Sequence, residues 1–389
     1  MKTSEAIQEF SLLGGPLHRL GCRLGLVRDG THTIRLGLAI GGLAWGILVM
    51  LALLMGGGRQ LFFLGLIGIH VRLLVVVPLF FTCEAWVAPA MAEFVRNLVH
   101  SGVVPEDDLP ALAADIRRVN RLADSWLVEV FALLATFASP LLGMVVDLPG
   151  KTADLSSVLA ESGGKFGPVM VWYLLLCLPL FRFLLFRWVW RLGLWWFFLW
   201  RLGRRKLHLV PTHSDGVAGL GFLEVVHEHF MPFAFALAAF YAATFAEDIA
   251  AGTMAFEALY GYVPLILLAV AALFIGPLFL FSAKLWNARV TGWSEYMGMA
   301  SHYVDAFDRK WIRAGNLPGE AELGTPDLQS LADLTNSLDV VRNLRVAPVS
   351  RRLLSGFAVA VALPMLPLVL FKYPAGAVAA KLFQTLTGL

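Results

Sequence analysis

The stretch "LFFLGLIGIHVRLLVVVPLFFTCE", residues 61–84, decides the fold class because it is long and apolar enough to cross a bilayer. A helix needs roughly 20 apolar residues to span the hydrocarbon core of a membrane. His70 and Arg72 lie near the middle of the stretch. A central arginine costs roughly 2.5–3.5 kcal/mol on insertion scales, which the surrounding apolar side chains can outweigh. We therefore expect a transmembrane helix that carries two ionisable groups at its centre.

Comparable apolar runs recur along the whole chain, which has 389 residues, of which 58% are hydrophobic and 15% charged. Soluble domains carry about 25% charged residues. This composition predicts an all-α polytopic membrane helix bundle with the lipid bilayer around it and about seven transmembrane helices. The formal net charge of +3 is too small to indicate a nucleic-acid partner. The predicted spans are residues 34–55, 61–83, 125–146, 168–188, 230–247, 262–284 and 353–371.

The connections between these spans are alternately rich and poor in lysine and arginine. The connections rich in positive charge are residues 1–33, 84–124, 187–215 and 285–352, and the connections between them are poor in it. With seven spans, all four basic stretches fall on one side of the membrane. The positive-inside rule then predicts a cytoplasmic N-terminus and an external C-terminus.

The same pattern predicts the organisation of the chain. Residues 1–33 form a cytoplasmic or interfacial segment, and residues 34–284 form the bundle of spans one to six, including a cytoplasmic helical loop at 84–124. Residues 285–352 form a second cytoplasmic helical segment, in which Asp327 is expected to cap a helix. Residues 353–389 hold the last span and a tail.

The sequence also predicts where one further helix begins and where the fourth span ends. A helix is predicted to start after Pro110 in the loop 84–124. The apolar run from Phe166 to Trp200 is too long for one crossing, at about 1.5 Å per residue. We therefore expect the fourth span to end near Trp188 and the chain to bend or continue along the interface, where tryptophan and arginine are favoured.

The ionisable residues at membrane depth are the first candidates for function. Charged groups within spans normally face a bundle interior or water and have a partner. His70 and Arg72 are thus predicted to line an anion or proton pathway, with a structural arginine paired to another helix as the alternative. Pro78, six residues later, is expected to kink the helix.

Three other charged residues belong to the same hypothesis. Glu84 ends the second span and Glu129 lies near the start of the third, so both are predicted partners for arginines near the cytoplasmic side. Arg182 lies within the fourth span. Its long side chain can also reach the cytoplasmic interface without any role in a pathway.

The stretch "HSDGVAGLGFLEVVHEH", residues 213–229, gathers metal-ligand side chains just before the fifth span. Histidine and carboxylate together suit a divalent metal, so a site is predicted at His213, Asp215, Glu224 and His227. A pH-responsive polar cluster is an alternative, since histidine titrates near neutrality. In the third interpretation His213 and Asp215 cap a helix whose first turn is solvated.

Small residues in the first span indicate close helix packing. Gly37, Gly41, Gly42 and Gly46 form two overlapping GxxxG pairs. Such pairs let helices approach closely. The contact is predicted either within the chain or between protomers of a homo-oligomer.

Two segments, "PTHSDGVAGLGFL" and "SLADLTNSLDVVRNLR", resemble an uncharacterised bacterial multi-pass membrane family. The likeness extends from the second span to the C-terminus. It implies a bacterial inner-membrane location and carries no activity with it.

A channel or transporter for a small ion or solute is the function that the sequence favours. Besides His70 and Arg72, prolines and glycines interrupt other spans, and interrupted helices are the usual route to binding sites at membrane depth. A membrane enzyme with a metal at the cytoplasmic face is one alternative. A scaffold or signalling subunit that uses the two cytoplasmic helical stretches is the other. The interrupting residues are Pro179, Pro264, Gly276, Pro277, Pro364 and Pro367.

Overall fold

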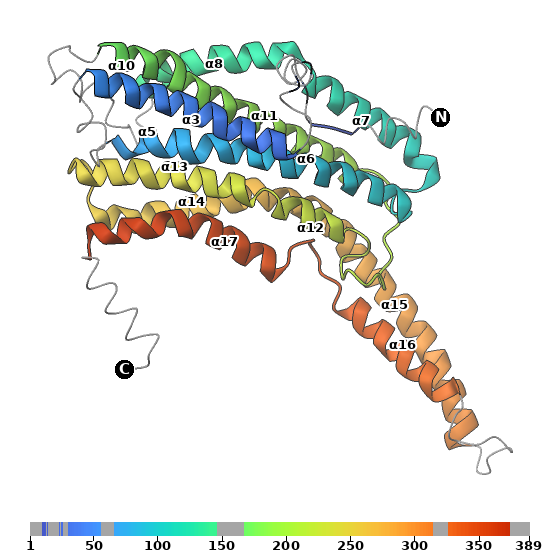
Figure 1. The fold of residues 1–389 in the computed structure, drawn as a ribbon. Coiled ribbons are helices and arrows are strands. Elements are labelled where there is room, and N and C mark those ends of the chain that lie inside the picture. The colour runs from blue at the N-terminus through green and yellow to red at the C-terminus, as the bar shows by residue number, and fades with distance from the viewer. Residues whose placement is uncertain are drawn as a thin grey trace.

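The computed structural model describes residues 10–12, 14, 23, 25, 30–55, 66–145, 167–313 and 326–373, and for 139–145 only the helix to which they belong. Every regular element within these ranges is a helix, as the sequence predicts. The long helices lie side by side, and a helical hairpin projects from one end of the bundle (Figure 1).

Six helices in the described ranges are long and apolar enough to cross a membrane. They overlap six of the seven predicted spans, which supports a multi-pass membrane protein. The remaining predicted span coincides with α8 (Trp126–Val145). The side chains at the end of α8 lie outside the described part, so the seventh crossing stays a prediction. The six helices are Thr31–Leu54, Ile67–His100, Gly167–Gly203, Gly221–Ala250, Phe256–Phe274 and Arg351–Phe371.

Two of these helices are longer than the sequence predicted. The second runs through α5 (Ile67–Val71), η2 (Arg72–Val76) and α6 (Val77–His100), so the loop expected from residue 84 begins only after His100. The third runs through α10 (Gly167–Trp172), η4 (Tyr173–Cys177) and α11 (Leu178–Gly203). The helix has no break at Trp188, since α11 runs on to Gly203, and the point where the crossing ends stays a prediction. The helix continues because the residues after Trp188 pack into the core, among them Trp195, Phe198, Leu199 and Leu202.

The π-helical segments η2 and η4 share one sequence feature. Each is followed by a proline at the same distance from its first residue, Pro78 after Arg72 and Pro179 after Tyr173. A proline has no N–H to donate and its ring clashes with the carbonyl four residues earlier. A π turn opens the helical ladder at this point, which lets the helix pass through the proline. The kink predicted at Pro78 is thus a local widening of a continuous helix.

The first membrane helix, α3 (Gly30–Leu54), packs along the second. Gly37 approaches the Phe81 side chain, and Gly41 approaches the backbone carbonyl of Leu73. A side chain at either position would collide with that neighbour. Gly42 and Gly46 have open space around them. The predicted small-residue contact therefore forms within the chain for Gly37 and Gly41, and homo-oligomerisation stays a prediction.

The helices that follow complete the bundle. They are α12 (Gly221–Glu228), α13 (Met231–Ala250), α14 (Leu259–Phe274) and α17 (Arg351–Met365). At Gly276 and Pro277, and again near Pro364 and Pro367, α-helix gives way to 3₁₀ segments, η6 (Gly276–Phe281) and η8 (Leu366–Phe371). The predicted helix interruptions are confirmed at these two places.

Two helical features lie at the end of the bundle where α12 begins. The helix predicted after Pro110 is α7 (Leu109–Ala123). Its buried Asp115 carboxylate accepts hydrogen bonds from Arg201 of α11 and from Arg205, which follows the end of α11. The arm, residues 282–313 and 326–342, contains α15 (Ser282–Phe307), η7 (Asp308–Ile312) and α16 (Pro326–Arg342). The arm projects away from the membrane helices (Figure 1).

Candidate functional site

Arg72 is buried within the bundle, with 4% of its surface exposed. Its Nη1 donates a hydrogen bond to the Tyr173 hydroxyl at 2.5 Å, and its guanidinium lies 5.3 Å from the centre of the Phe240 ring. Its Nε has no hydrogen-bond partner among the described residues. Arg72 and Tyr173 are the first residues of η2 and η4, so the two π segments meet through this bond. The prediction that Arg72 faces the protein interior is confirmed.

Glu247 of α13 is a buried acid whose carboxylate feels the charge of Arg72. Its side chain is buried, with 2% of the residue exposed, and Oε1 accepts the backbone N–H of Gly68 at 2.7 Å. Oε2 has no hydrogen-bond partner in the part of the chain that the structure describes. The Arg72 charge acts on this carboxylate electrostatically, yet the two described side chains form no direct ion pair. We call Arg72, Tyr173, Glu247 and Gly68 the Arg72 cluster.

Gly68 leaves room for the Glu247 carboxylate in this arrangement. A Cβ there would come within 2.8 Å of Glu247 Oε1 and 2.9 Å of Oε2. The missing side chain lets the carboxylate reach the helix backbone. Sequence reasoning missed both Gly68 and Glu247, because Glu247 stands beside Asp248 at the end of an apolar run and resembles an interfacial acid.

His70 does not join the Arg72 cluster. Its Nδ1 accepts a hydrogen bond from Trp45 Nε1 of α3 at 2.8 Å, and the two rings meet edge to face. Arg72 instead reaches Tyr173 on the neighbouring long helix. The two residues predicted to line one pathway therefore contact different helices.

Glu84 forms a buried ion pair with Arg191 of α11. Its Oε2 accepts a hydrogen bond from Arg191 Nη1 at 2.7 Å, and both side chains are buried. Trp188, one turn earlier on α11, donates its indole N–H to the Phe80 carbonyl at 3.2 Å. Glu84 was predicted as a partner for an arginine, but Arg191 was not singled out as that arginine.

Glu129 and Arg182 are both half-buried. Glu129 lies in the first turn of α8 and lines a cavity of about 830 Å³ between α3, α8 and the third long helix. Neither residue contributes to the Arg72 cluster.

Asp215 organises the turn before α12. Its carboxylate accepts the backbone N–H groups of Val217, Gly219 and Gly221 at 2.7–3.2 Å, and its Oδ1 lies 3.0 Å from His213 Nδ1. Gly221 is the first residue of α12, so Asp215 satisfies a donor at the helix start. The capping interpretation is correct for Asp215.

The other two predicted metal ligands are engaged elsewhere. Glu224 Oε2 accepts a hydrogen bond from Arg345 at 2.9 Å, and Oε1 accepts the Ser350 N–H at 3.1 Å. His227 is fully buried, accepts the Trp195 indole N–H at 3.1 Å and pairs through Nδ1 with the Phe274 carbonyl. The expected solvated first turn is therefore wrong for these two residues. Within the described residues, no three His, Cys, Asp or Glu side chains are grouped to hold a metal.

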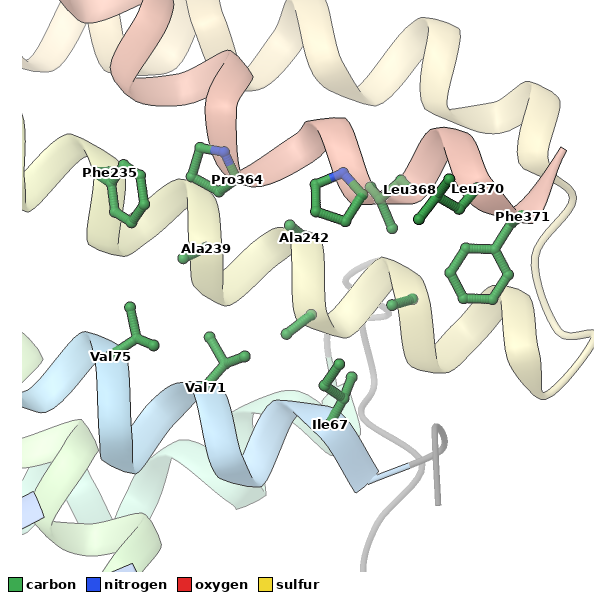
Figure 2. Close-up of a pocket in the computed structure, with 13 residues that line it drawn as sticks. Ile67, Val71, Val75, Phe235, Ala239, Ala242, Pro364, Leu368, Leu370 and Phe371 are labelled. Carbon is green, nitrogen blue, oxygen red and sulfur yellow. The ribbon is translucent and has the colours of Figure 1, made fainter. Parts of the chain in front are cut away.

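A groove runs along α13 beside the Arg72 cluster. One part of it is a cavity of about 530 Å³ whose walls come from the second long helix and from α17 with η8, and whose floor is a row of α13 alanines. Ile67, Val71 and Val75 face Pro364 and Leu368 across this space (Figure 2). A second cavity of about 720 Å³ shares Phe235 with the first and ends near Glu228 and Arg352. We call the two cavities together the α13 groove.

Comparison with protein-family models, with curated proteins and with solved structures finds no match for this chain. The site is therefore interpreted from its own geometry.

Proposed function

We propose that the protein is a membrane transport protein for a small ion, with the Arg72 cluster as its site at membrane depth. One observation carries this proposal: a guanidinium and a carboxylate are both buried among membrane helices without a direct ion pair, and each keeps an unpartnered polar atom. Charged groups within membrane spans are costly and mark ion pathways and proton relays. A purely structural pair would close the contact.

The chemistry of the cluster suits a proton or a small anion. The Glu247 carboxyl can gain and lose a proton, and the Arg72 guanidinium offers a donor to an anion. Tyr173 holds the guanidinium through its hydroxyl. Both residues begin π segments, which widen their helices locally, and such bulges are frequent at functional sites.

Proton and anion flux in reconstituted liposomes test this proposal. A trapped pH-sensitive dye reports proton flux, and a chloride-sensitive dye reports anion flux. Glu247→Gln keeps the shape of the side chain and removes its charge, so we expect proton flux to fall at least about tenfold, as when one catalytic proton carrier is lost. Glu257→Gln, at an exposed acid paired with Lys372, is the matched control and should leave flux unchanged.

Two results oppose the proposal. If liposomes with wild-type protein show no more proton or anion flux than empty liposomes, the transport proposal is wrong. Flux that persists unchanged in a folded Glu247→Gln protein removes the Arg72 cluster as the pathway. Folding is checked by size-exclusion elution and by the helical circular dichroism signal of each variant.

The α13 groove favours a second function, the handling of a lipid-like substrate. The cavity of about 530 Å³ is lined by apolar side chains. The cavity of about 720 Å³ ends beside the ion pair between Arg352 and Glu228, whose atoms lie 3.2 Å apart. Ala242→Phe would fill the smaller cavity, so transbilayer movement of a fluorescent phospholipid should slow. Ala269→Phe, at an exposed alanine of α14, is the control. Lipid movement that is insensitive to Ala242→Phe opposes this function.

The location of the protein is part of the same proposal. The resemblance to a bacterial multi-pass family supports the inner membrane, and the positive-inside pattern supports a cytoplasmic arm and N-terminus. A single cysteine introduced on the arm at Ser301, tested with a membrane-impermeant thiol reagent on intact and opened cells, measures this orientation. Labelling of this cysteine on intact cells would show that the arm is external and contradict the proposed orientation.

A further inference from the structure

A pocket of about 450 Å³ lies where the arm joins the last membrane helix. Three arginines line it from three elements: Arg289 on α15, Arg342 at the end of α16 and Arg345 in the loop that leads to α17. No acidic side chain lines the pocket, and its other lining residues are neutral. Among the described residues, three arginines therefore line one pocket, and none of the other lining side chains carries a negative charge.

Arg345 is fixed in place by the turn before α12. Its Nη1 binds Glu224 at 2.9 Å, its Nη2 donates to the Asp215 carbonyl at 3.2 Å, and its backbone N–H donates to the Gly216 carbonyl at 2.9 Å. Glu224 also accepts the Ser350 N–H, so both of its oxygens are engaged. The Glu224 carboxylate is therefore committed to holding Arg345 and the loop.

Arg289 and Arg342 differ from Arg345 in this respect. Within the described part of the chain, neither makes a hydrogen bond or an ion pair, although Arg289 is half-buried. The backbone N–H groups of Val346 and Ala347, in the lining of the same pocket, also have no acceptor among the described residues. Guanidinium and amide donors that have no acceptor among the described residues therefore line the same pocket.

We propose that this pocket binds a phosphate-bearing anion. Guanidinium groups present planar forks of donors that match phosphate oxygens. Backbone N–H groups add donors of the kind found in phosphate sites. The same chemistry belongs to the headgroup of an anionic phospholipid and to a soluble phosphate compound. The site is separate from the Arg72 cluster and does not depend on the transport proposal.

Binding to the full-length protein in uncharged detergent tests the proposal by isothermal calorimetry. Inorganic pyrophosphate is the soluble probe. Short-chain phosphatidylglycerol is the lipid probe, with short-chain phosphatidylcholine as its neutral counterpart. Arg289→Gln and Arg342→Gln should each weaken binding about tenfold, the expected effect of losing one charge-assisted hydrogen bond. Arg289→Lys keeps the charge without the fork and should weaken it less.

Arg309→Gln is the matched control, because it removes the same charge from an exposed position on the same arm. Arg345 is left intact, since it holds the loop together. Pyrophosphate binding that the two Gln variants weaken and the control retains supports a site for a soluble anion. The same pattern with phosphatidylglycerol alone supports a lipid headgroup site. Absence of binding by both probes, or equal binding by wild type and both Gln variants, overturns the proposal.

Discussion

Arg72 and Arg191 are both buried arginines in long helices of the bundle, but their surroundings differ. Arg191 has a carboxylate oxygen of Glu84 at 2.7 Å. Arg72 has a neutral tyrosine hydroxyl at 2.5 Å, and its acid, Glu247, binds a backbone N–H instead. Both arginines keep one unpartnered nitrogen. Only at Arg72 is the carboxylate also left with an unpartnered oxygen.

This difference distinguishes the Arg191–Glu84 pair, which is structural, from the Arg72 cluster, which we propose exchanges its hydrogen-bond partners. Breaking a buried ion pair is strongly destabilising, because the remaining charge stays buried. Where the two charges are not in contact, removing one relieves a desolvation cost as well as losing an interaction. Stability measurements on matched variants can therefore tell the two sites apart.

Glu84→Gln should have the largest effect on stability. It leaves Arg191 buried beside a neutral group, which costs about 3–5 kcal/mol in the free energy of unfolding. Unfolding by sodium dodecyl sulfate in mixed micelles measures this value. Glu93→Gln, which removes a half-exposed partner of Arg96, is the control and should change little. A loss below about 1 kcal/mol, the size of an exposed pair, would remove the distinction.

Asp115→Asn should have the next largest effect. Asp115 is buried at the end of the bundle, but the arginines that bind it are partly exposed and can regain water. We expect a loss of about 1.5–3 kcal/mol, the range for a hydrogen bond to a charged group. Amide hydrogen exchange in α7 should rise at the same time, since Asp115 ties α7 to α11. Asp107→Asn, at an exposed acid, should change neither measurement.

Arg72→Gln should cost less stability than either change. The variant loses the Tyr173 hydrogen bond but also removes a buried charge, so the net change should be about 1 kcal/mol or less. Ion flux should fall nonetheless. Unfolding free energy and flux, measured on the same preparation, give the result. A destabilisation as large as that of Glu84→Gln would make Arg72 a structural arginine and contradict the proposed function.

The exposed pair on the arm should give the smallest effect. The Lys310 ammonium and the Trp311 N–H bind Asp327 and hold the pKa of its carboxyl below the ordinary value. The interaction is therefore fully present above an ordinary pKa of about 3.9 and is lost as the pH falls through the lower folded value. Protease cleavage of the arm should rise only in that acidic range. Asp327→Asn should abolish the pH dependence, and an arm equally resistant throughout would contradict it.

Much of the fold could be predicted from sequence because membrane helices depend on local composition. Apolar length located all six membrane helices, and Pro110 located the start of α7. The cost of a charge in lipid predicted that Arg72 faces the interior. These inferences need no knowledge of which helices are neighbours.

The partners of the site could not be predicted, because they come from distant parts of the chain. Glu247 lies 179 residues from Gly68, and no local pattern links them. His227 and Glu224 share a helix face, but their environments differ: one is enclosed by aromatic rings and the other meets Arg345. The lengths of the two longest helices also depended on packing beyond the membrane.

The π segment η2 has a consequence for the direction in which charges point. Residues 72 and 84 on an unbroken α-helix would be rotated about 120° from each other around the axis, since each residue turns the chain by about 100°. One extra residue in a π turn reduces that rotation to about 20°. Arg72 and Glu84 therefore project toward the same neighbour, the helix Gly167–Gly203, where Tyr173 and Arg191 meet them. Deleting one residue from η2 would swing one of the two charges away from its partner.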